Sequence, residues 1–564
     1  MSKLTTEFSK NMDKSTPFGD YPRPRLVRDS YICLNGEWDF AYSREEPREY
    51  TEKILVPFPP ESALSGIERG HEDGIKLYYR RTFTLPDGFV KKSVILHFGA
   101  VDQLASVYIN GVPVGENEGG YIPFSFDITS ALVEGENEIK VIATDDLNTD
   151  LPYGKQTKKR GGMWYTPVSG IWQTVWLESL PDSPIKSVKI TQSAKEAAFE
   201  VKCDSSELKL TLLDSGEVYY FNGCRFTVKP RQIRLWSPEE PNLYRYKLES
   251  ENDEVTGYFA LREIGTATVN GVKRLTLNGK PYLFNGLLDQ GYFPDGLFLP
   301  ATPEGYKNDI LTAKALGFNT LRKHIKIEPE IFYYMCDFYG IAVFQDMVNN
   351  SDYSFLRDTV LPTLGMKSIP DKRLHKSKRS RTVFIKTMNE TIEHLYSYPS
   401  VLYYTIFNEG WGQFCSDEIY ETAKALDKTR IFDSTSGWFK RKKSDVISHH
   451  VYFKKLKAKP DAERPVIISE FGGYSYRCEG HVFGGGNYGY RSLKTVRELE
   501  ESLFKLYEEE VKPLVEKCVS ALIYTQISDV EDETNGFLTY DRRVLKVDGE
   551  KFKKLIKSIE ESIK

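Results

Sequence analysis

Hydrophobic and polar residues alternate in short runs through about the first 260 residues of the chain. Ser93–Phe98, Glu138–Thr144 and Leu208–Leu213 are such runs, and alternation with a period of two is typical of half-buried β-strands. Ser106–Ile109 leads directly into an Asn110-Gly111 turn, which indicates a hairpin. Because no helical pattern of useful length interrupts these runs, we predict two β-sandwich modules in tandem, the second one spanning about 80 residues.

The pattern changes near residue 265 to strands that alternate with amphipathic helices. The predicted strands are Tyr282–Gly286, Thr320–Lys323, Ala342–Asp346, Val401–Asn408, Ile431–Ser434, Val446–His450, Val466–Glu470 and Ala521–Gln526. The predicted helices are Pro303–Leu316, Pro329–Tyr339, Ser416–Asp427, a long helix from Leu493 to Val515, and Phe552–Ile563. Eight strands in about 300 residues predict a (β/α)8 barrel, whose fifth strand has the weakest pattern.

Composition narrows the class of function. The 564 residues carry a formal net charge of -4, which favours neither nucleic acid nor a membrane surface as a partner. The 7 cysteines are scattered without the spacing of a zinc site, so we expect no metal, no cofactor and no disulfide framework. The N-terminus has no signal-peptide pattern, and the chain has no apolar run of about 18 residues. We therefore expect a cytoplasmic protein.

Two glutamates stand at the ends of predicted barrel strands, where the reactive groups of such barrels lie. Glu409 follows Val401–Asn408, and Glu470 ends its own strand. A glutamate is costly at a buried strand end unless it is paired or functional, and a salt bridge at the rim is the alternative for each. Glycoside hydrolysis needs two facing carboxylates, one to protonate the leaving oxygen and one to attack the anomeric carbon or activate water. Asn408 can donate hydrogen bonds to a neighbouring sugar hydroxyl.

Other side chains near strand ends are candidates for contact with a sugar. Aromatic rings can stack on a pyranose face, although packing explains each of them more readily. These aromatic residues are Tyr404, Trp411, Trp438, Tyr452 and Tyr524. Two histidines, His324 and His450, are candidate hydrogen-bond partners of the sugar, and a purely structural histidine is the alternative for each.

The sequence around both glutamates resembles glycoside hydrolase family 2, which includes β-galactosidases, β-glucuronidases and β-mannosidases. The resemblance covers nearly the whole chain. The motifs are Leu34-Asn35-Gly36-Glu37-Trp38, Ser169-Gly170-Ile171-Trp172-Gln173, Gly317-Phe318-Asn319-Thr320-Leu321-Arg322, Phe407-Asn408-Glu409-Gly410-Trp411-Gly412 and Ile468-Ser469-Glu470-Phe471-Gly472-Gly473. The resemblance implies a jelly-roll-like domain (1–183), an immunoglobulin-like β-sandwich (184–264) and a catalytic TIM barrel (265–564). It also implies a retaining mechanism, with Glu409 as acid/base, Glu470 as nucleophile and carboxyl groups about 5–5.5 Å apart.

Departures from the family pattern concern the sugar rather than the reaction. Asp289-Gln290-Gly291 replaces an Arg-His-Glu element, Trp164 stands where other members have an aspartate, and the Asn-x-Lys element of glucuronidases is not visible. We expect an exo-acting β-galactosidase-like enzyme, with a β-glucuronidase or other β-uronidase as the alternative. A carbohydrate-binding protein without catalysis is the alternative from another class. A homo-oligomer is left open. The residues expected to bind substrate are Asn408, Asp289, Arg322, His324, Asp346, Trp438, His450, Tyr452, Tyr524 and Gln526.

Three further features have simpler explanations than a special function. Lys323 and Lys326 could pair with a uronate, but we expect solvated lysines. The pattern Gly484-x-Gly486-x-x-Gly489 does not directly follow a strand, so we interpret it as a mobile loop over the active site rather than a nucleotide site. The basic stretch Lys367–Arg381 is expected to be a solvated surface loop, with recognition of an acidic glycan as the alternative.

Overall fold

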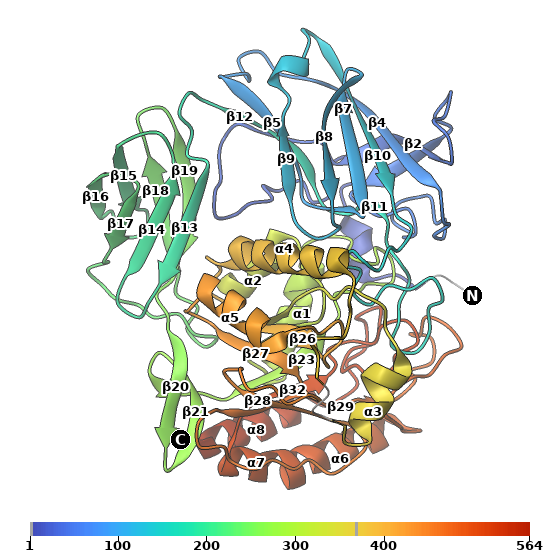
Figure 1. The fold of residues 1–564 in the computed structure, drawn as a ribbon, viewed down its shortest axis with the longest axis vertical. Helices are drawn as coiled ribbons and strands as arrows, with labels where there is room; N and C mark the ends of the chain where they lie inside the picture. The colour runs from blue at the N-terminus through green and yellow to red at the C-terminus, as the bar shows by residue number, and fades with distance from the viewer. Residues whose placement is uncertain (1–3, 367–369, 564) are drawn as a thin grey trace.

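The computed structural model describes residues 4–366 and 370–563, which form three domains in tandem (Figure 1). The first two domains are β-sandwiches, and the third is a barrel of parallel strands surrounded by helices. The predicted fold class, two β-sandwiches followed by an eight-stranded α/β barrel, is confirmed. None of the helices in the described ranges combines the length and the apolar composition that a membrane-spanning helix requires.

The first domain packs a four-stranded sheet against a six-stranded sheet. In order across each sheet, the strands are β1 (Tyr31–Cys33), β12 (Val175–Leu180), β5 (Ser93–Phe98) and β9 (Phe124–Asp127), then β3 (Glu52–Val56), β2 (Gly36–Ser43), β4 (Lys76–Thr84), β10 (Glu136–Thr144), β7 (Leu104–Ile109) and β8 (Val112–Glu118). Every second residue of β10 is buried, as the alternating sequence predicts. The inward side chains, Trp38, Phe98 and Val141 among them, form one core.

The second domain has seven strands in two sheets around a core that includes Phe199, Tyr246 and Phe259. The sheets are β13 (Ser187–Gln192), β14 (Ala197–Lys202) and β17 (Arg225–Val228), and β16 (Val218–Asn222), β15 (Glu207–Leu212), β18 (Tyr244–Glu249) and β19 (Glu254–Phe259). A small antiparallel sheet that the sequence pattern did not predict follows: β20 (Ile264–Val269), β21 (Val272–Leu277) and β22 (Lys280–Pro281). The predicted domain border at 264/265 falls inside β20, and the domain limits stay predictions.

The barrel consists of eight parallel strands. They are β23 (Phe284–Asp289), β24 (Thr320–Lys323), β25 (Ala342–Asp346), β26 (Val401–Asn408), β27 (Ile431–Ser436), β28 (Ile447–Val451), β29 (Val466–Gly472) and β32 (Val519–Thr525). The first strand ends at Asp289 rather than Gly286, because Leu287–Asp289 pair with Leu321–Lys323. No ladder joins β27 to β28 in the described structure, so the barrel is nearly but not fully closed at its weakest predicted strand.

Helices pack around the outside of the barrel. They are α1 (Glu304–Ala315), α2 (Glu330–Tyr339), α4 (Lys378–Leu395), α5 (Ser416–Leu426), α6 (Val496–Leu506), α7 (Lys512–Lys517) and α8 (Gly549–Glu560), with a short α3 (Leu361–Thr363). The predicted long helix from Leu493 to Val515 is divided by a π-helical turn, Tyr507–Val511, between α6 and α7. The division leaves Leu503, Tyr507 and Val511 buried against the barrel.

The prediction of a solvated loop over Lys367–Arg381 is wrong at its C-terminal end. Residues 367–369 lie outside the described residues, whereas Lys378–Arg381 form the first turn of α4. The Ser377 side chain caps this helix by accepting a hydrogen bond from the Ser380 backbone N–H. Arg381 is not simply solvated, because it donates to the carbonyl oxygens of Leu374 and His375 at 2.6 and 2.7 Å.

The first sandwich covers the carboxyl ends of barrel strands. The backbone N–H groups of Tyr153 and Gly154 both donate to the Asn349 carbonyl, which follows β25. Gly154 approaches so closely that a Cβ there would lie 2.8 Å from the Ile325 carbonyl oxygen, which leaves no room for a side chain. Trp172 of the sandwich shares a buried cluster with Phe298 of the barrel. The sandwich therefore forms part of the wall around the reactive edge of the barrel.

Candidate active site

Glu409 and Glu470 meet at the carboxyl edge of the barrel. Glu409 directly follows β26 and adopts the left-handed backbone conformation, with φ of 52°. The chain therefore turns sharply at the strand end. Glu470 lies in β29, on the other side of the barrel opening. One carboxylate oxygen of Glu409 and one of Glu470 lie within 4.8 Å of each other.

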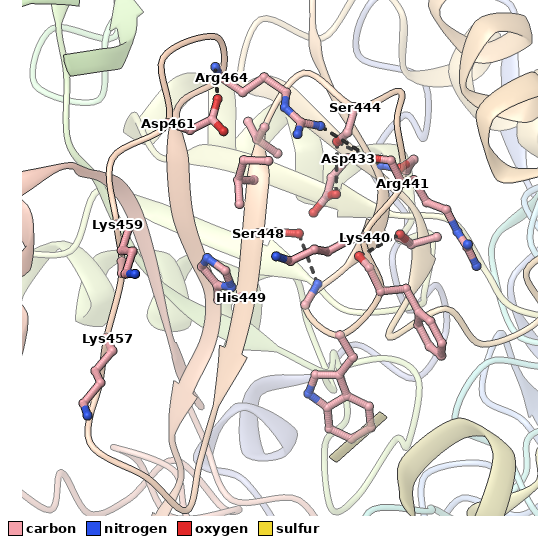
Figure 2. Close-up of a pocket in the computed structure, with 18 of the residues that line it drawn as sticks. Asp433, Lys440, Arg441, Ser444, Ser448, His449, Lys457, Lys459, Asp461 and Arg464 are labelled. Carbon is pink, nitrogen blue, oxygen red and sulfur yellow. Dashed lines mark hydrogen bonds between the residues drawn. The ribbon is translucent and has the colours of Figure 1, made fainter. Parts of the chain in front are cut away.

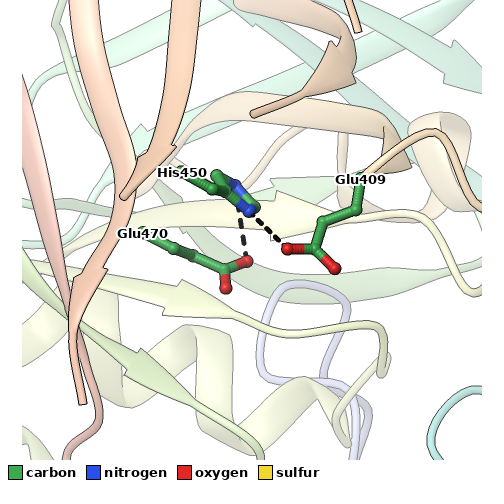
Figure 3. Close-up of side chains that lie close together, drawn as sticks. All are labelled: Glu409, His450 and Glu470. Carbon is green, nitrogen blue, oxygen red and sulfur yellow. Dashed lines mark hydrogen bonds and ion pairs between the residues drawn. The ribbon is translucent and has the colours of Figure 1, made fainter. Parts of the chain in front are cut away.

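His450, near the end of β28, lies between the two glutamates (Figure 3). Its Nδ1 is 2.8 Å from Oε1 of Glu409, and its Nε2 is 3.5 Å from Oε1 of Glu470. Nε2 also lies 2.9 Å from the Ser436 hydroxyl. One imidazole ring therefore contacts both carboxylates that the sequence singled out.

Glu470 is more deeply buried than Glu409, with 6% of its side chain exposed against 18%. Its Oε1 accepts a hydrogen bond from Arg322 Nη1 at 2.9 Å, and its Oε2 accepts one from the Tyr452 hydroxyl. Burial acts to raise the pKa of Glu470, but the charges of His450 and Arg322 outweigh it, and the pKa falls to about 2. Glu470 is therefore ionised at neutral pH.

Arg322, in β24, holds several predicted site residues in one network. Its Nε donates to Asp346 Oδ1 at 2.9 Å, and its Nη2 donates to Asn408 Oδ1 at 2.8 Å. Because the amide oxygen of Asn408 accepts from Arg322, its NH2 group is the part of the amide that can donate to a sugar hydroxyl. His324 Nδ1 lies 2.8 Å from the other oxygen of Asp346. Burial lowers the pKa of His324, so its Nδ1–H donates to Asp346 and Nε2 is left as an acceptor.

The expectation of solvated lysines after β24 is wrong. Lys323 is fully buried, and Lys326 is 2% exposed. Lys323 donates to Asp289 at 2.7 Å and to Glu328 at 2.8 Å, and Lys326 donates to the same Glu328 oxygen. Two acids compensate two buried cations, which is how buried charge is tolerated. The other oxygen of Asp289 accepts the Gly291 backbone N–H, and these contacts argue against Asp289 as a sugar ligand.

The aromatic candidates divide by burial. Tyr404, Tyr524 and Trp411 are at most 3% exposed, and their rings pack against other rings. Trp438 and Tyr452 are partly exposed. Their ring centroids lie 6.4 and 6.5 Å from that of His450. Trp438 and Tyr452 are therefore the aromatic candidates placed to contact a sugar.

Sequence reasoning missed two charged side chains at this site, Glu533 and Lys155. Glu533 follows β32, is 2% exposed, and accepts a hydrogen bond from the Tyr165 hydroxyl. It also accepts one from Nε2 of Gln526, a predicted site residue, at 3.3 Å. Burial raises the pKa of Glu533, and the positive charge of Lys155 opposes that rise. Both residues lie in loops without periodicity, so the pattern gave no signal for them.

Lys155 comes from the first sandwich, next to the Gly154 backbone that packs on the barrel. Its Nζ lies 5.4 Å above the ring of Trp164, whose centroid is 5.2 Å from that of Trp411. Lys155 forms no ion pair with any residue in the described part of the chain. The sandwich thus contributes both an aromatic side chain and a cation to the barrel mouth.

The glycine-rich segment lies beside Glu533, as expected of a loop at the active site. The Tyr488 N–H donates to the Asp532 carbonyl at 2.7 Å, and the Thr534 N–H donates to the Tyr488 carbonyl at 3.1 Å. The ring of the nearby Tyr490 stacks on Tyr452 with centroids 3.7 Å apart. The position of the segment agrees with the prediction, and its mobility stays a prediction.

Comparison with known families identifies the chain. Three successive family models match it: the sugar-binding domain of glycosyl hydrolases family 2 over residues 67–181, a further family 2 domain over 179–262, and the family 2 TIM barrel domain over 268–482. The chain belongs to glycoside hydrolase family 2. The predicted family is therefore confirmed.

Relatives of this family 2 hydrolase carry more than one activity in their names. A β-galactosidase from Thermoanaerobacter pseudethanolicus is 30% identical over 48% of this chain and 39% of its own length. A putative β-glucuronidase from Formosa agariphila is 25% identical over 77% of this chain and 40% of its own length. The chain thus spans less than half of these curated relatives. The solved β-D-glucuronidase of Dictyoglomus thermophilum matches 95% of this chain and 98% of its own, with 18% identity and a TM-score of 0.75, which shows a shared fold.

A cavity of about 630 Å³ lies at the open seam of the family 2 barrel, between β27 and β28 (Figure 2). His449 lines it, whereas the next residue, His450, faces the carboxylates of Glu409 and Glu470. Successive side chains of a strand point to opposite faces, which explains the difference. Trp438 also lines the cavity and so separates it from the active site. Neither glutamate of the active site is among the lining residues.

The two glutamates and the histidine between them could also hold a metal ion. Glu409, His450 and Glu470 each offer one ligand atom, and these atoms all lie within 4.8 Å of one another. Carboxylate oxygen and imidazole nitrogen are the donors that Zn²⁺ accepts. Both carboxylates are the groups that glycoside hydrolysis would use, so a metal ion here would compete with the sugar for them.

Proposed function

We propose that this protein is a retaining exo-β-glycosidase in which Glu470 is the nucleophile and Glu409 the acid/base. The observation that carries the proposal is the approach of the two carboxylates to within 4.8 Å. Retaining glycosidases hold these groups about 5–5.5 Å apart, whereas inverting enzymes need about 6.5–9.5 Å to admit a water molecule. Burial also supports these roles, since the deeply buried, ionised Glu470 suits a nucleophile.

The geometry supports two displacement steps. In the first, an oxygen of Glu470 bonds to the anomeric carbon while the bond to the leaving oxygen breaks, and Glu409 gives its proton to that oxygen. In the second, water attacks the anomeric carbon, the bond to Glu470 breaks, and the proton from water passes to Glu409. Arg322 and Tyr452 hold Glu470 in place between these steps.

We favour a neutral sugar of the β-galactoside type in the pocket. The carboxyl group of Glu533 lies beside Gln526. In its ionised form it would repel the carboxylate of a uronate. Lys323 and Lys326 are already paired with acids and have no charge left for a uronate. The name of the Thermoanaerobacter relative agrees with this substrate class.

A β-uronide is the second candidate, because one observation favours it. Lys155 has a positive charge and no ion pair among the described residues, and its Nζ lies 5.4 Å from the Trp164 ring at the barrel mouth. Solved structures of similar fold include a β-galacturonidase of Eisenbergiella tayi bound to galacturonate, with 19% identity and a TM-score of 0.70. A uronate carboxylate could pair with Lys155.

A panel of aryl β-galactosides and β-glucuronides tests both parts of the proposal. We expect turnover of the galactoside, with the β anomer as the first product seen by NMR. An initial α product would contradict the retaining mechanism. Binding of sugars without turnover of any glycoside would support a carbohydrate-binding protein instead. A cytoplasmic location and the oligomeric state stay predictions.

A further inference from the structure

A second cavity, of about 440 Å³, lies where all three domains meet. Its lining comes from β5, β9 and β12 of the first sandwich, from β13 and β14 of the second, and from α2 and α4 of the barrel. In Figure 1, α4 lies directly below the space between the two sandwiches. None of the lining residues belongs to the active site described above.

Several buried N–H groups of this lining have no acceptor. They are Arg25 Nε and Nη1, Arg23 Nε and Trp176 Nε1, and Trp176 is only 2% exposed. His97 Nε2 lies 3.2 Å from a Glu178 oxygen instead. No side-chain oxygen of the described lining is buried without a donor. A buried donor without a partner is costly. The hydrogen-bond partners missing from this cavity are acceptors and not donors.

The two arginines of the lining differ in their partners. Arg23 is compensated, since its Nη2 donates to both oxygens of Glu178 at 2.5 and 2.6 Å. Arg25 has no ion pair with a described residue, and its guanidinium carbon lies 4.5 Å from the Tyr398 ring centroid. The acids of the lining are engaged or at the rim: Glu200 pairs with Arg225 at 3.3 Å, Glu330 accepts the Tyr398 hydroxyl, and Glu393 is exposed.

The rim and one wall add two further features. The rim carries Lys186, Lys189 and Lys202, which attract anions. In the wall, Trp176 and His97 stack in parallel, with centroids 4.8 Å apart and an angle of 10° between the rings. Such a flat aromatic face beside N–H donors suits a sugar ring that carries an acidic group.

We propose that this cavity is an oxyanion-binding site, in which Arg25 and Trp176 are the principal donors. The ligand chemistry is a sulfate, phosphate or carboxylate group, either as the free inorganic anion or on an acidic saccharide. An oxyanion accepts hydrogen bonds and donates none in its ionised form, so it matches the excess of donors. Bound at the junction, it would join the two sandwiches to the barrel.

Thermal unfolding of the full chain in sulfate and in chloride at equal ionic strength tests the site. Sulfate also stabilises proteins without binding, so the comparison needs matched variants. Arg25→Gln removes the free charge, Trp176→Phe removes one N–H but keeps an aromatic ring, and Arg497→Gln, whose side chain is 86% exposed on α6, is the control. A specific site raises the unfolding midpoint with the logarithm of the sulfate concentration once that exceeds the dissociation constant, whereas exclusion of sulfate from the surface acts in proportion to its concentration.

We expect Arg25→Gln and Trp176→Phe to weaken the apparent affinity for sulfate at least about tenfold, and Arg497→Gln to leave it unchanged. If the wild type and both cavity variants respond to sulfate alike, the proposal is wrong. Phosphate and a sulfated disaccharide form two further arms. A midpoint shift that begins at lower concentration with the disaccharide than with sulfate assigns the site to acidic saccharides, and the reverse order assigns it to the inorganic anion.

Discussion

Nδ1 of His450 lies 2.8 Å from Oε1 of Glu409. Through Nε2 the same ring reaches Glu470 at 3.5 Å. A histidine in this position can hold the Glu409 proton in a hydrogen bond and can stabilise the negative charge of Glu470. It therefore links the two carboxylates that have opposite roles in the proposed reaction.

Replacing His450 should slow the reaction and change its pH dependence. For His450→Asn we expect kcat/KM to fall about 100-fold, the scale of one displaced acid–base partner. The pKa of Glu470 is held at about 2 against burial by His450 and Arg322. Without His450 this pKa rises, so the acid limb of the pH–kcat/KM profile should move to higher pH. Rates measured on an aryl glycoside from pH 3 to 9 provide the test.

His449→Asn is the matched control for this experiment. His449 is the neighbouring residue of the same strand but lines the seam cavity, so its replacement should leave the pH profile of the wild type intact. Equal shifts in both variants would mean that the change in the profile comes from disturbance of β28 and not from His450.

The two glutamates should be separable by azide. Glu470→Ala removes the nucleophile, so we expect a loss of about 10⁴-fold or more and an α-glycosyl azide when azide occupies the vacated face. Glu409→Ala leaves the nucleophile in place, so we expect a β-glycosyl azide and a smaller loss, about 10²–10⁴-fold, with good leaving groups affected least. NMR of the azide products distinguishes the two. The same anomer from both variants would refute the assignment of roles.

A divalent metal ion should inhibit rather than activate the enzyme. Glu409, His450 and Glu470 offer three ligand atoms within 4.8 Å of one another, so Zn²⁺ bound there would occupy both catalytic carboxylates. We expect inhibition by micromolar Zn²⁺ that EDTA reverses, and full activity in EDTA alone. Loss of activity in EDTA, restored by a metal ion, would show instead that the site uses a metal.

The sequence was sufficient for the parts of the barrel where local pattern and structure agree. The run Val401–Asn408 is largely apolar and has no charged residue, and the observed strand has the same bounds. The placement of Glu409 at the carboxyl edge of the barrel followed from that run alone, because the carboxyl ends of parallel barrel strands lie at one edge. The apolar pattern of the buried face of α4, with Phe384, Met388 and Ile392, was also present in the sequence. The many basic residues before it indicated a loop, so this helix was not predicted.

Other parts of the site depend on contacts between segments distant in sequence. Glu533 and Lys155 lie close enough to interact electrostatically only because the first sandwich packs on the barrel through Gly154 and Asn349. Lys323 follows an ordinary strand, and nothing local shows that Asp289 and Glu328 pair with it. Composition and periodicity report on local structure, whereas these pairings are set by tertiary packing.

The stability that Asp337 and Asp529 contribute should decline as pH rises from about 4 to 7. Burial raises the pKa of Asp337 to about 7, and it raises the pKa of Asp529 to about 6 although Lys546 opposes it. A carboxyl with a raised pKa binds its proton more tightly in the folded state. Its contribution is therefore complete below the unfolded pKa of about 3.9 and is lost as pH rises through the folded pKa.

Thermal unfolding measured at one-unit pH steps checks this decline. The Asp337→Asn variant cannot ionise at this position, so between about pH 5 and 7 its midpoint should fall less, or rise more, than that of the wild type, whatever its absolute stability. Glu470 acts in the opposite direction, since its lowered pKa removes stability only as pH falls toward 2. The same pH dependence of the midpoint in the wild type and in Asp337→Asn would contradict the prediction.

The choice of sugar should depend on the carboxyl group of Glu533. It is buried beside Gln526 and near the Lys155 charge, and in its ionised form it would repel a substrate carboxylate. Glu533→Gln keeps the size of the side chain and removes the charge, so Lys155 would be left to attract an anion. We expect the ratio of kcat/KM for an aryl β-glucuronide to that for the β-galactoside to rise at least about tenfold, on the scale of one charge–charge contact.

Glu531→Gln is the matched control, because Glu531 accepts the Thr166 backbone N–H instead of facing Gln526. An unchanged ratio in Glu533→Gln would exclude Glu533 as the residue that selects against uronides, and an equal rise in both variants would point to the net charge of the loop.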